Sequence, residues 1–124
     1  MILLQKPGHY RKLGYLLVMS IIVLSLSPSS SLPQFSWDRM FGIDKIFHFF
    51  FHGLASFCFL KSAEENAAFK IALAMFLFGF LIECLQKFLP GGRFFDVADL
   101  VANLTGILAA ILLFKYSFQK FSGE

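Results

Sequence analysis

Charged residues and cysteines are scarce in this chain, and each scarcity excludes a common class of protein. Of the 124 residues, 15% are charged and 57% are hydrophobic, whereas a soluble domain averages about 25% and about 45–50%. Eighteen residues are phenylalanine, which is more aromatic surface than a water-soluble protein of this size could bury. The two cysteines, Cys58 and Cys84, both lie in apolar runs. Neither a disulfide framework nor a cysteine-based zinc site is therefore expected.

Positive charge is too scattered to suggest a nucleic-acid partner. The net charge is +3, and the lysines and arginines occur in small groups along the chain. Proteins that bind nucleic acids gather such residues on one polar face. We therefore expect no nucleic-acid partner, and the length of the chain predicts a single domain over residues 1–124.

The chain contains four long apolar runs. With their flanks they cover about residues 10–28, 44–62, 70–89 and 97–116. A bilayer core of about 30 Å takes about 20 helical residues, a length that the last two runs meet directly and the second meets when it is counted whole. The sequence predicts an all-α fold, a polytopic transmembrane bundle of four spans surrounded by membrane lipid.

The first apolar run has two interpretations. Lys6, Arg11 and Lys12 precede it and the serine-rich stretch 25–31 follows, as in a secretory signal that is cleaved. The proline and serines of that stretch also suit the end of a helix that is retained. We favour retention, and the other three spans keep their orientation in either case.

Basic residues predict how the spans are oriented. With four spans, the N-terminus, the 61–70 loop and the C-terminus share one side of the membrane. Lysines and arginines are more frequent on that side, and the positive-inside rule then places both termini in the cytoplasm. The basic residues of that side are Lys6, Arg11, Lys12, Lys61, Lys70, Lys115 and Lys120, against Arg39, Lys45, Lys87 and Arg93 on the other.

Polar residues of the last three spans concentrate in the halves that this orientation places outside. Residues three or four apart share one face of a helix, so each helix carries one polar stripe. The stripes are Asp44, His48 and His52; Glu83 and Gln86; and Asp99, Asn103 and Gly106. An ionisable side chain that faces lipid costs about 2.5–3.5 kcal/mol on insertion scales. We therefore expect the stripes to face one another in an outward-facing polar pocket, with Arg93 at its mouth as a counter-ion.

Several of these residues also have a purely structural interpretation. Asp44, Asp96 and Asp99 suit the N-termini of helices, where carboxylates cap and stabilise the first turn. Gln86 and Asn103 could simply form hydrogen bonds between helices. Lys45 is expected to extend to the membrane surface.

Three functions remain open for the pocket. In the first, it binds a ligand through residues around its wall, namely Asp44, Gln86, Arg93, Asp96, Asp99 and Asn103. In the second, Glu83 and His48 form a catalytic acid/base pair, although no convincing nucleophile accompanies them. In the third, a metal is held by nitrogen and oxygen ligands, namely His48, His52, Asp44 and Glu83. The pattern points to no particular cofactor.

Two segments resemble the VanZ-like family of small bacterial membrane proteins. They are DKIFHFFFHGLASF at 44–57 and ECLQKFLPGGRFFDVADLVANLTGIL at 83–108. The residues that carry the resemblance are Asp44, Lys45, His48, Phe49, Glu83, Gln86, Gly92, Arg93, Asp96, Asp99, Asn103 and Gly106. His52 departs from the family pattern, so no role is carried over to it.

The resemblance implies a place in the bacterial inner membrane. The family's namesake is associated with low-level resistance to the lipoglycopeptide antibiotic teicoplanin. An envelope lipid or glycolipid is therefore the class of ligand that the resemblance implies.

Overall fold

The computed structural model describes residues 7–27, 42–89 and 95–122, and within these ranges it contains helices and turns but no strand. The helices are α1 (Pro7–Leu26), α3 (Ile43–Ser62), α4 (Ala68–Lys87) and α5 (Val97–Ser122). A short 3-10 helix, η3 (Glu65–Ala67), joins α3 to α4. The predicted all-α bundle is confirmed.

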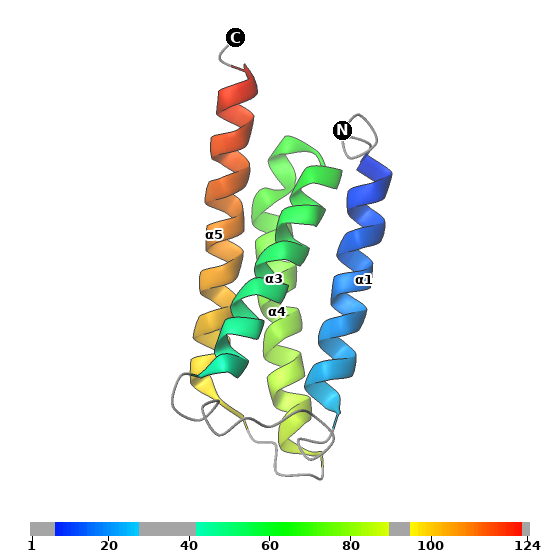
Figure 1. Cartoon of the computed structure of the whole chain (residues 1–124), viewed down its shortest axis with the longest axis vertical. Coiled ribbons are helices and arrows are strands. Elements are labelled where there is room, and N and C mark those ends of the chain that lie inside the picture. The colour runs from blue at the N-terminus through cyan, green and yellow to red at the C-terminus, as the bar shows by residue number, and fades with distance from the viewer. Residues whose placement is uncertain (1–6, 28–41, 90–94, 123–124) are drawn as a thin grey trace.

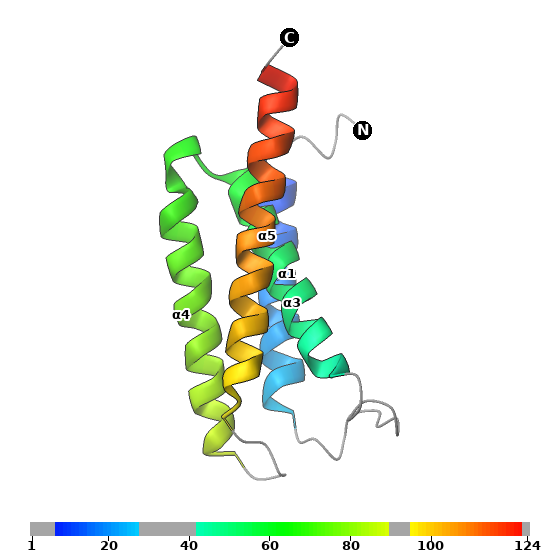
Figure 2. The same cartoon turned by 90° about the vertical axis from the view of Figure 1, so that its left-hand side faces the viewer.

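Successive helices of the bundle run in opposite directions (Figure 1). As a result, α1 begins and α5 ends at one end of the bundle, which we call the terminal end. At the other end, α3 and α5 begin and α4 finishes, and we call this the polar end. Figure 2 shows α4 standing to one side of the other three helices.

Within the part of the chain that the structure describes, three helical segments are long and apolar enough to cross a membrane: Gly8–Leu26, Ala68–Lys87 and Val97–Ser117. Their large apolar side chains, such as Leu16, Phe69 and Leu112, are exposed on the outside of the bundle, as expected where lipid is the solvent. The remaining helix, α3, has the same 20-residue length as α1 and α4. It packs against both α1 and α5, so four spans are compatible with this bundle.

Two glycines allow α3 and α5 to approach closely. A Cβ atom on Gly106 would lie 2.2 Å from the carbonyl oxygen of Phe49, and one on Gly53 would lie 3.0 Å from the carbonyl oxygen of Gly106. A side chain at Gly106 would force the two backbones apart and one at Gly53 would make a tight contact, and small residues at such crossings are typical of membrane helices. The crossing fixes how the polar residues of α3 and α5 meet, because His48 and Asn103 lie about one turn away from it on the two helices.

The half of the bundle towards the terminal end has an apolar core. Ala55, Met75 and Ile107 are buried in contact with one another, and apolar side chains of α1 and α4 surround them. Polar groups of the interior therefore lie mostly between this core and the polar end.

Candidate functional site

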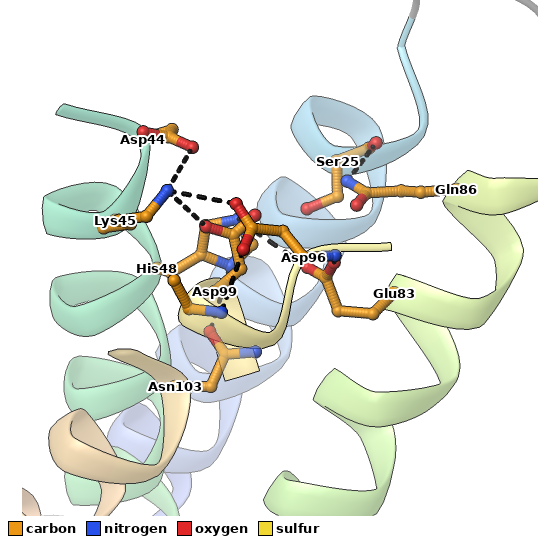
Figure 3. Close-up of polar contacts among 10 residues, drawn as sticks. Ser25, Asp44, Lys45, His48, Glu83, Gln86, Asp96, Asp99 and Asn103 are labelled. Carbon is orange, nitrogen blue, oxygen red and sulfur yellow. Dashed lines mark hydrogen bonds and ion pairs between the residues drawn. The ribbon is translucent and has the colours of Figure 1, made fainter. Parts of the chain in front are cut away.

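Side chains from three helices meet at the polar end of the bundle (Figure 3). We call this group the polar cluster, and its members are Asp44, Lys45, His48, Glu83, Asp96, Asp99 and Asn103. Side-chain exposure falls steadily through it, from 55% at Asp44 and 26% at Asp96 to 11% at His48 and 0% at Glu83. The cluster therefore leads from the end of the bundle into its interior.

The start of α3 is set by Gly42. This residue has a left-handed backbone conformation, with φ of 61°, which glycine adopts without steric cost. Its carbonyl oxygen accepts hydrogen bonds from the backbone N–H groups of Lys45 and Ile46 at 2.9 and 3.3 Å. Asp44 thus lies in the first turn of α3, where the helix dipole favours a carboxylate, and one helical turn separates it from His48.

The start of α5 is capped by Asp96. Its Oδ1 accepts a hydrogen bond from the Ala98 N–H at 2.9 Å, the contact typical of a capping aspartate. Asp96 lies just outside the helix. Burial alone would raise the pKa of its carboxyl group, but the hydrogen bonds from Lys45 and Ala98 outweigh burial and lower that pKa. The capping interpretation of Asp96 thus describes a real contact, and its other oxygen remains part of the cluster.

Lys45 joins three carboxylates. Its Nζ lies 3.1 Å from Asp96 Oδ2, 3.3 Å from Asp44 Oδ2 and 3.4 Å from Asp99 Oδ1. The expectation that Lys45 extends to the membrane surface stays a prediction. Its side chain is 38% exposed, and these carboxylates hold its ammonium group at the rim of the cluster.

His48 lies at the centre of the cluster with its two nitrogens in different surroundings. Nδ1 is 3.0 Å from the amide oxygen of Asn103, which can only accept a hydrogen bond, so Nδ1 carries a proton. Nε2 faces two carboxylates, at 3.5 Å from Asp99 Oδ2 and 4.0 Å from Glu83 Oε1. Asn103 therefore orients the ring, and Nε2 is directed at Asp99 and Glu83.

Glu83 is fully buried at the end of α4. Its Oε2 accepts a hydrogen bond from the backbone N–H of Asp96 at 3.2 Å, which ties α4 to the residue before α5. Arg93, the predicted counter-ion, lies outside the described residues. Among the described residues, Lys45 forms ion pairs with Asp44, Asp96 and Asp99, and His48 Nε2 faces Glu83 and Asp99.

Gln86 lies in the same helix but points elsewhere. Its side-chain Nε2 donates a hydrogen bond to the backbone carbonyl oxygen of Ser25 at 2.8 Å, and this contact is buried. Figure 3 shows the Gln86 side chain directed towards α1, apart from His48. This contact corresponds to the helix-to-helix hydrogen bond considered above.

His52 lies one turn deeper than His48. Its ring stacks on that of His48 with centroids 6.1 Å apart, and it also contacts Phe78. It is buried, and neither ring nitrogen forms a hydrogen bond with the part of the chain that the structure describes.

The structure does not bring the four predicted metal ligands together. The described residues contain two groups of potential ligand atoms, and within each group the atoms lie within 4.8 Å of one another. They are His48, Glu83 and Asp99, and Asp44, Asp96 and Asp99. Asp44 and His52 thus lie apart from the pair formed by His48 and Glu83.

The cluster offers acid/base groups, but the described hydroxyl groups nearby are engaged or distant. The Thr105 hydroxyl donates a hydrogen bond to the carbonyl oxygen of Val101 in its own helix. Ser56 lies a further turn below His52. Neither of these two hydroxyl groups is therefore placed to act as a nucleophile beside His48 and Glu83.

Comparison with known proteins identifies a family. A model of the family described as VanZ/LLP1 matches residues 4–119, nearly the whole chain, and confirms the resemblance found in the sequence. No curated protein and no solved structure matches the chain.

Proposed function

The chain belongs to the VanZ/LLP1 family of membrane proteins, and we propose that it works in the bacterial inner membrane with its polar end facing outwards. The bundle supports this orientation because both ends of the described chain lie at the terminal end (Figure 1). Basic residues at or near the terminal end, by the positive-inside rule, suit the cytoplasmic side. Those in the described ranges are Arg11, Lys12, Lys61, Lys70 and Lys115.

A compartment reporter tests this orientation. A reporter fused to the C-terminus should give a cytoplasmic signal, because α5 runs from the polar end to the terminal end. An external signal would contradict the outward-facing polar end.

The proposed activity is recognition of an envelope component by the polar cluster. The observation that carries it is the graded exposure, from the accessible carboxylate of Asp44 to the buried one of Glu83, in a bundle whose helices expose many large apolar side chains. Carboxylates accept hydrogen bonds from sugar hydroxyl and amino groups, and Lys45 and Arg93 would add cations for an acidic head group. An envelope lipid or glycolipid carries such a head group at the membrane surface, and in the proposed orientation the rim of the cluster would lie at that depth.

Teicoplanin resistance is the expected phenotype of this binding. Teicoplanin acts at the cell surface and carries a lipid chain, so a protein that binds or shields an envelope component can change its effect. Reduced susceptibility should therefore depend on the cluster, while the amount of folded protein should not.

The test compares three single variants, Glu83→Gln, His48→Ala and Arg93→Ala, in cells where the wild-type chain reduces susceptibility to teicoplanin. Each variant is scored for the amount of folded protein in the membrane and for susceptibility. We expect normal amounts and a susceptibility equal to that of cells without the chain. Thr105→Val serves as the control, since this exposed residue lies on α5 outside the cluster and should retain both wild-type properties.

Two results would count against the proposal. Wild-type susceptibility in all three variants would show that the cluster is not used. A fall in membrane protein that matches the change in susceptibility would show that the three residues support the fold instead.

Acid/base catalysis on an envelope lipid or glycolipid is the second candidate. It is favoured by the orientation of His48 by Asn103 and by the 4.0 Å separation of His48 Nε2 from Glu83 Oε1, a distance that one substrate group or water can bridge. Mass spectrometry of envelope lipids would detect a product that depends on the wild-type chain and disappears with Glu83→Gln. Identical lipid profiles in cells with the wild-type chain and in cells with Glu83→Gln would argue against catalysis and leave recognition as the proposed function.

A further inference from the structure

Three potential ligand atoms from three different segments face one another inside the polar cluster. They are Nε2 of His48, Oε1 of Glu83 and Oδ2 of Asp99, and the three residues form a group whose ligand atoms lie within 4.8 Å of one another. We propose that these side chains hold one divalent transition-metal ion.

The distances suit a shared ion better than direct hydrogen bonds. His48 Nε2 lies 3.5 Å from Asp99 Oδ2 and 4.0 Å from Glu83 Oε1, whereas N–H···O hydrogen bonds have lengths of about 2.7–3.2 Å. Two ligand atoms that bind one metal at about 2.1 Å with tetrahedral angles are about 3.4 Å apart. A small contraction of the group would therefore place all three atoms in one coordination sphere.

Each ligand is oriented by a contact at its other polar atom. His48 Nδ1 is held by Asn103 at 3.0 Å, and Glu83 Oε2 is held by the Asp96 N–H at 3.2 Å. Asp99 Oδ1 lies 3.4 Å from the ammonium group of Lys45. Metal ligands are characteristically fixed by such outer contacts, which set the ring tautomer of the histidine and the direction of the carboxylates. The proton on Nδ1 leaves the lone pair of a neutral ring on Nε2, the atom that faces the carboxylates.

Charge also favours a cation at this position. Glu83 and Asp99 are both buried, and buried carboxylates require compensation by protons, hydrogen bonds or cations. Lys45 contributes one positive charge that is shared with Asp44 and Asp96. A divalent ion between these two carboxylates would be attracted by the negative charge of both.

The second group of acids is a weaker candidate for the same ion. Asp44, Asp96 and Asp99 surround the ammonium group of Lys45 at 3.1–3.4 Å, so a cation already occupies that position. An imidazole nitrogen with carboxylate oxygens suits Zn²⁺ or Mn²⁺ better than all-oxygen groups do, which suit Mg²⁺ or Ca²⁺. Three protein ligands would leave a coordination position for water or a ligand oxygen.

The test uses the full-length chain in detergent after treatment with a chelator, titrated with Zn²⁺ alone by calorimetry. We expect one ion per chain. His48→Gln, Glu83→Gln and Asp99→Asn should each weaken binding at least about 100-fold, and Asn103→Leu about 10–100-fold, because Asn103 orients a ligand without binding the ion. His9→Gln is the matched control and should bind as wild type does, since His9 lies in the first turn of α1 near the terminal end.

A second measurement does not depend on the folding of cluster variants. The chain contains three histidines, and nitrogen NMR of the labelled wild-type protein should show Zn²⁺ shifting one ring nitrogen of one histidine. His9→Gln and His52→Gln assign the affected signal to His48 by elimination. Absence of Zn²⁺ binding to the wild-type protein at about 0.1 mM, an affinity found among the weaker dedicated cation sites, would overturn the proposal. So would a shift at His9 or His52 in place of His48.

This metal site and the proposed recognition of an envelope component can fail separately. Zn²⁺ is titrated without any envelope ligand, whereas susceptibility to teicoplanin is measured in cells.

Discussion

The crossing of α3 and α5 at Gly106 provides a strong test of the packing described here. Replacing Gly106 by alanine adds one Cβ atom, which would lie 2.2 Å from the Phe49 carbonyl oxygen and 3.2 Å from the Gly53 nitrogen. Ordinary contacts of a Cβ atom begin at 3.4 Å. Because the opposing atoms are backbone, no rotation of a side chain can relieve the overlap, and the helices must separate locally by about the difference, 3.4 − 2.2 = 1.2 Å.

A displacement of this size affects both stability and the polar cluster. Overpacking of a close contact typically costs about 1–3 kcal/mol and occasionally more, and a backbone overlap belongs at the upper end of that range. The same separation would stretch the 3.0 Å contact between His48 Nδ1 and Asn103 Oδ1 beyond hydrogen-bond length. We therefore expect Gly106→Ala to lower the free energy of unfolding by about 3 kcal/mol and to loosen the cluster.

Thermal unfolding of the purified chain in detergent checks this expectation. Gly8→Ala is the matched control, since a Cβ atom on Gly8 meets nothing within 4 Å and alanine is the better helix former. The control should unfold at or slightly above the wild-type temperature. If Gly106→Ala unfolds together with this control, the close crossing of α3 and α5 does not exist as described.

Two further predictions concern single contacts of the cluster and its surroundings. Gln86→Leu removes the donor to the buried carbonyl oxygen of Ser25. In the same unfolding assay it should lower the free energy of unfolding by about 1–3 kcal/mol. An unchanged free energy of unfolding would mean that water replaces this contact. Asp96 has a folded-state pKa below its ordinary value of 3.8, so its carboxylate stabilises the fold above about pH 4, and this contribution is lost as pH falls through the lowered pKa. Asp96→Asn should accordingly be less stable than wild type at pH 7, with a difference that shrinks towards pH 3, and a difference independent of pH would contradict the ion pair with Lys45.

The arrangement of helices could be predicted from the sequence because it follows from apolar length and helical period. Runs of about 20 apolar residues have few alternatives to membrane helices. The spacing of Asp44 and His48, and of Asp99 and Asn103, places each pair on one face of its helix. Successive membrane spans alternate in direction, so the rise per residue predicts that the polar residues of the different helices lie at similar depths.

Partners within the cluster could not be predicted in the same way. The sequence suggests which residues share a depth, but the rotation of each helix decides which of them touch. Gln86 was grouped with Glu83 because they lie three residues apart, yet that spacing also allows the two side chains to point to different neighbours, α1 and the start of α5. The ion pairs of Lys45 with Asp96 and Asp99 were not predicted for the same reason, since these residues on and before α5 become its neighbours only when the helices are packed.

The polar cluster is more than the bundle requires to hold its helices in place. The half towards the terminal end is packed by apolar residues such as Ala55, Met75 and Ile107, and the crossing of α3 and α5 depends on glycines. Replacing buried ionic groups by well-packed apolar residues is often neutral or stabilising, so packing alone gives no reason for a fully buried Glu83. On our proposal the cluster holds a ligand, and the metal titration and the susceptibility assay ask separately whether that ligand is an ion, a head group or both.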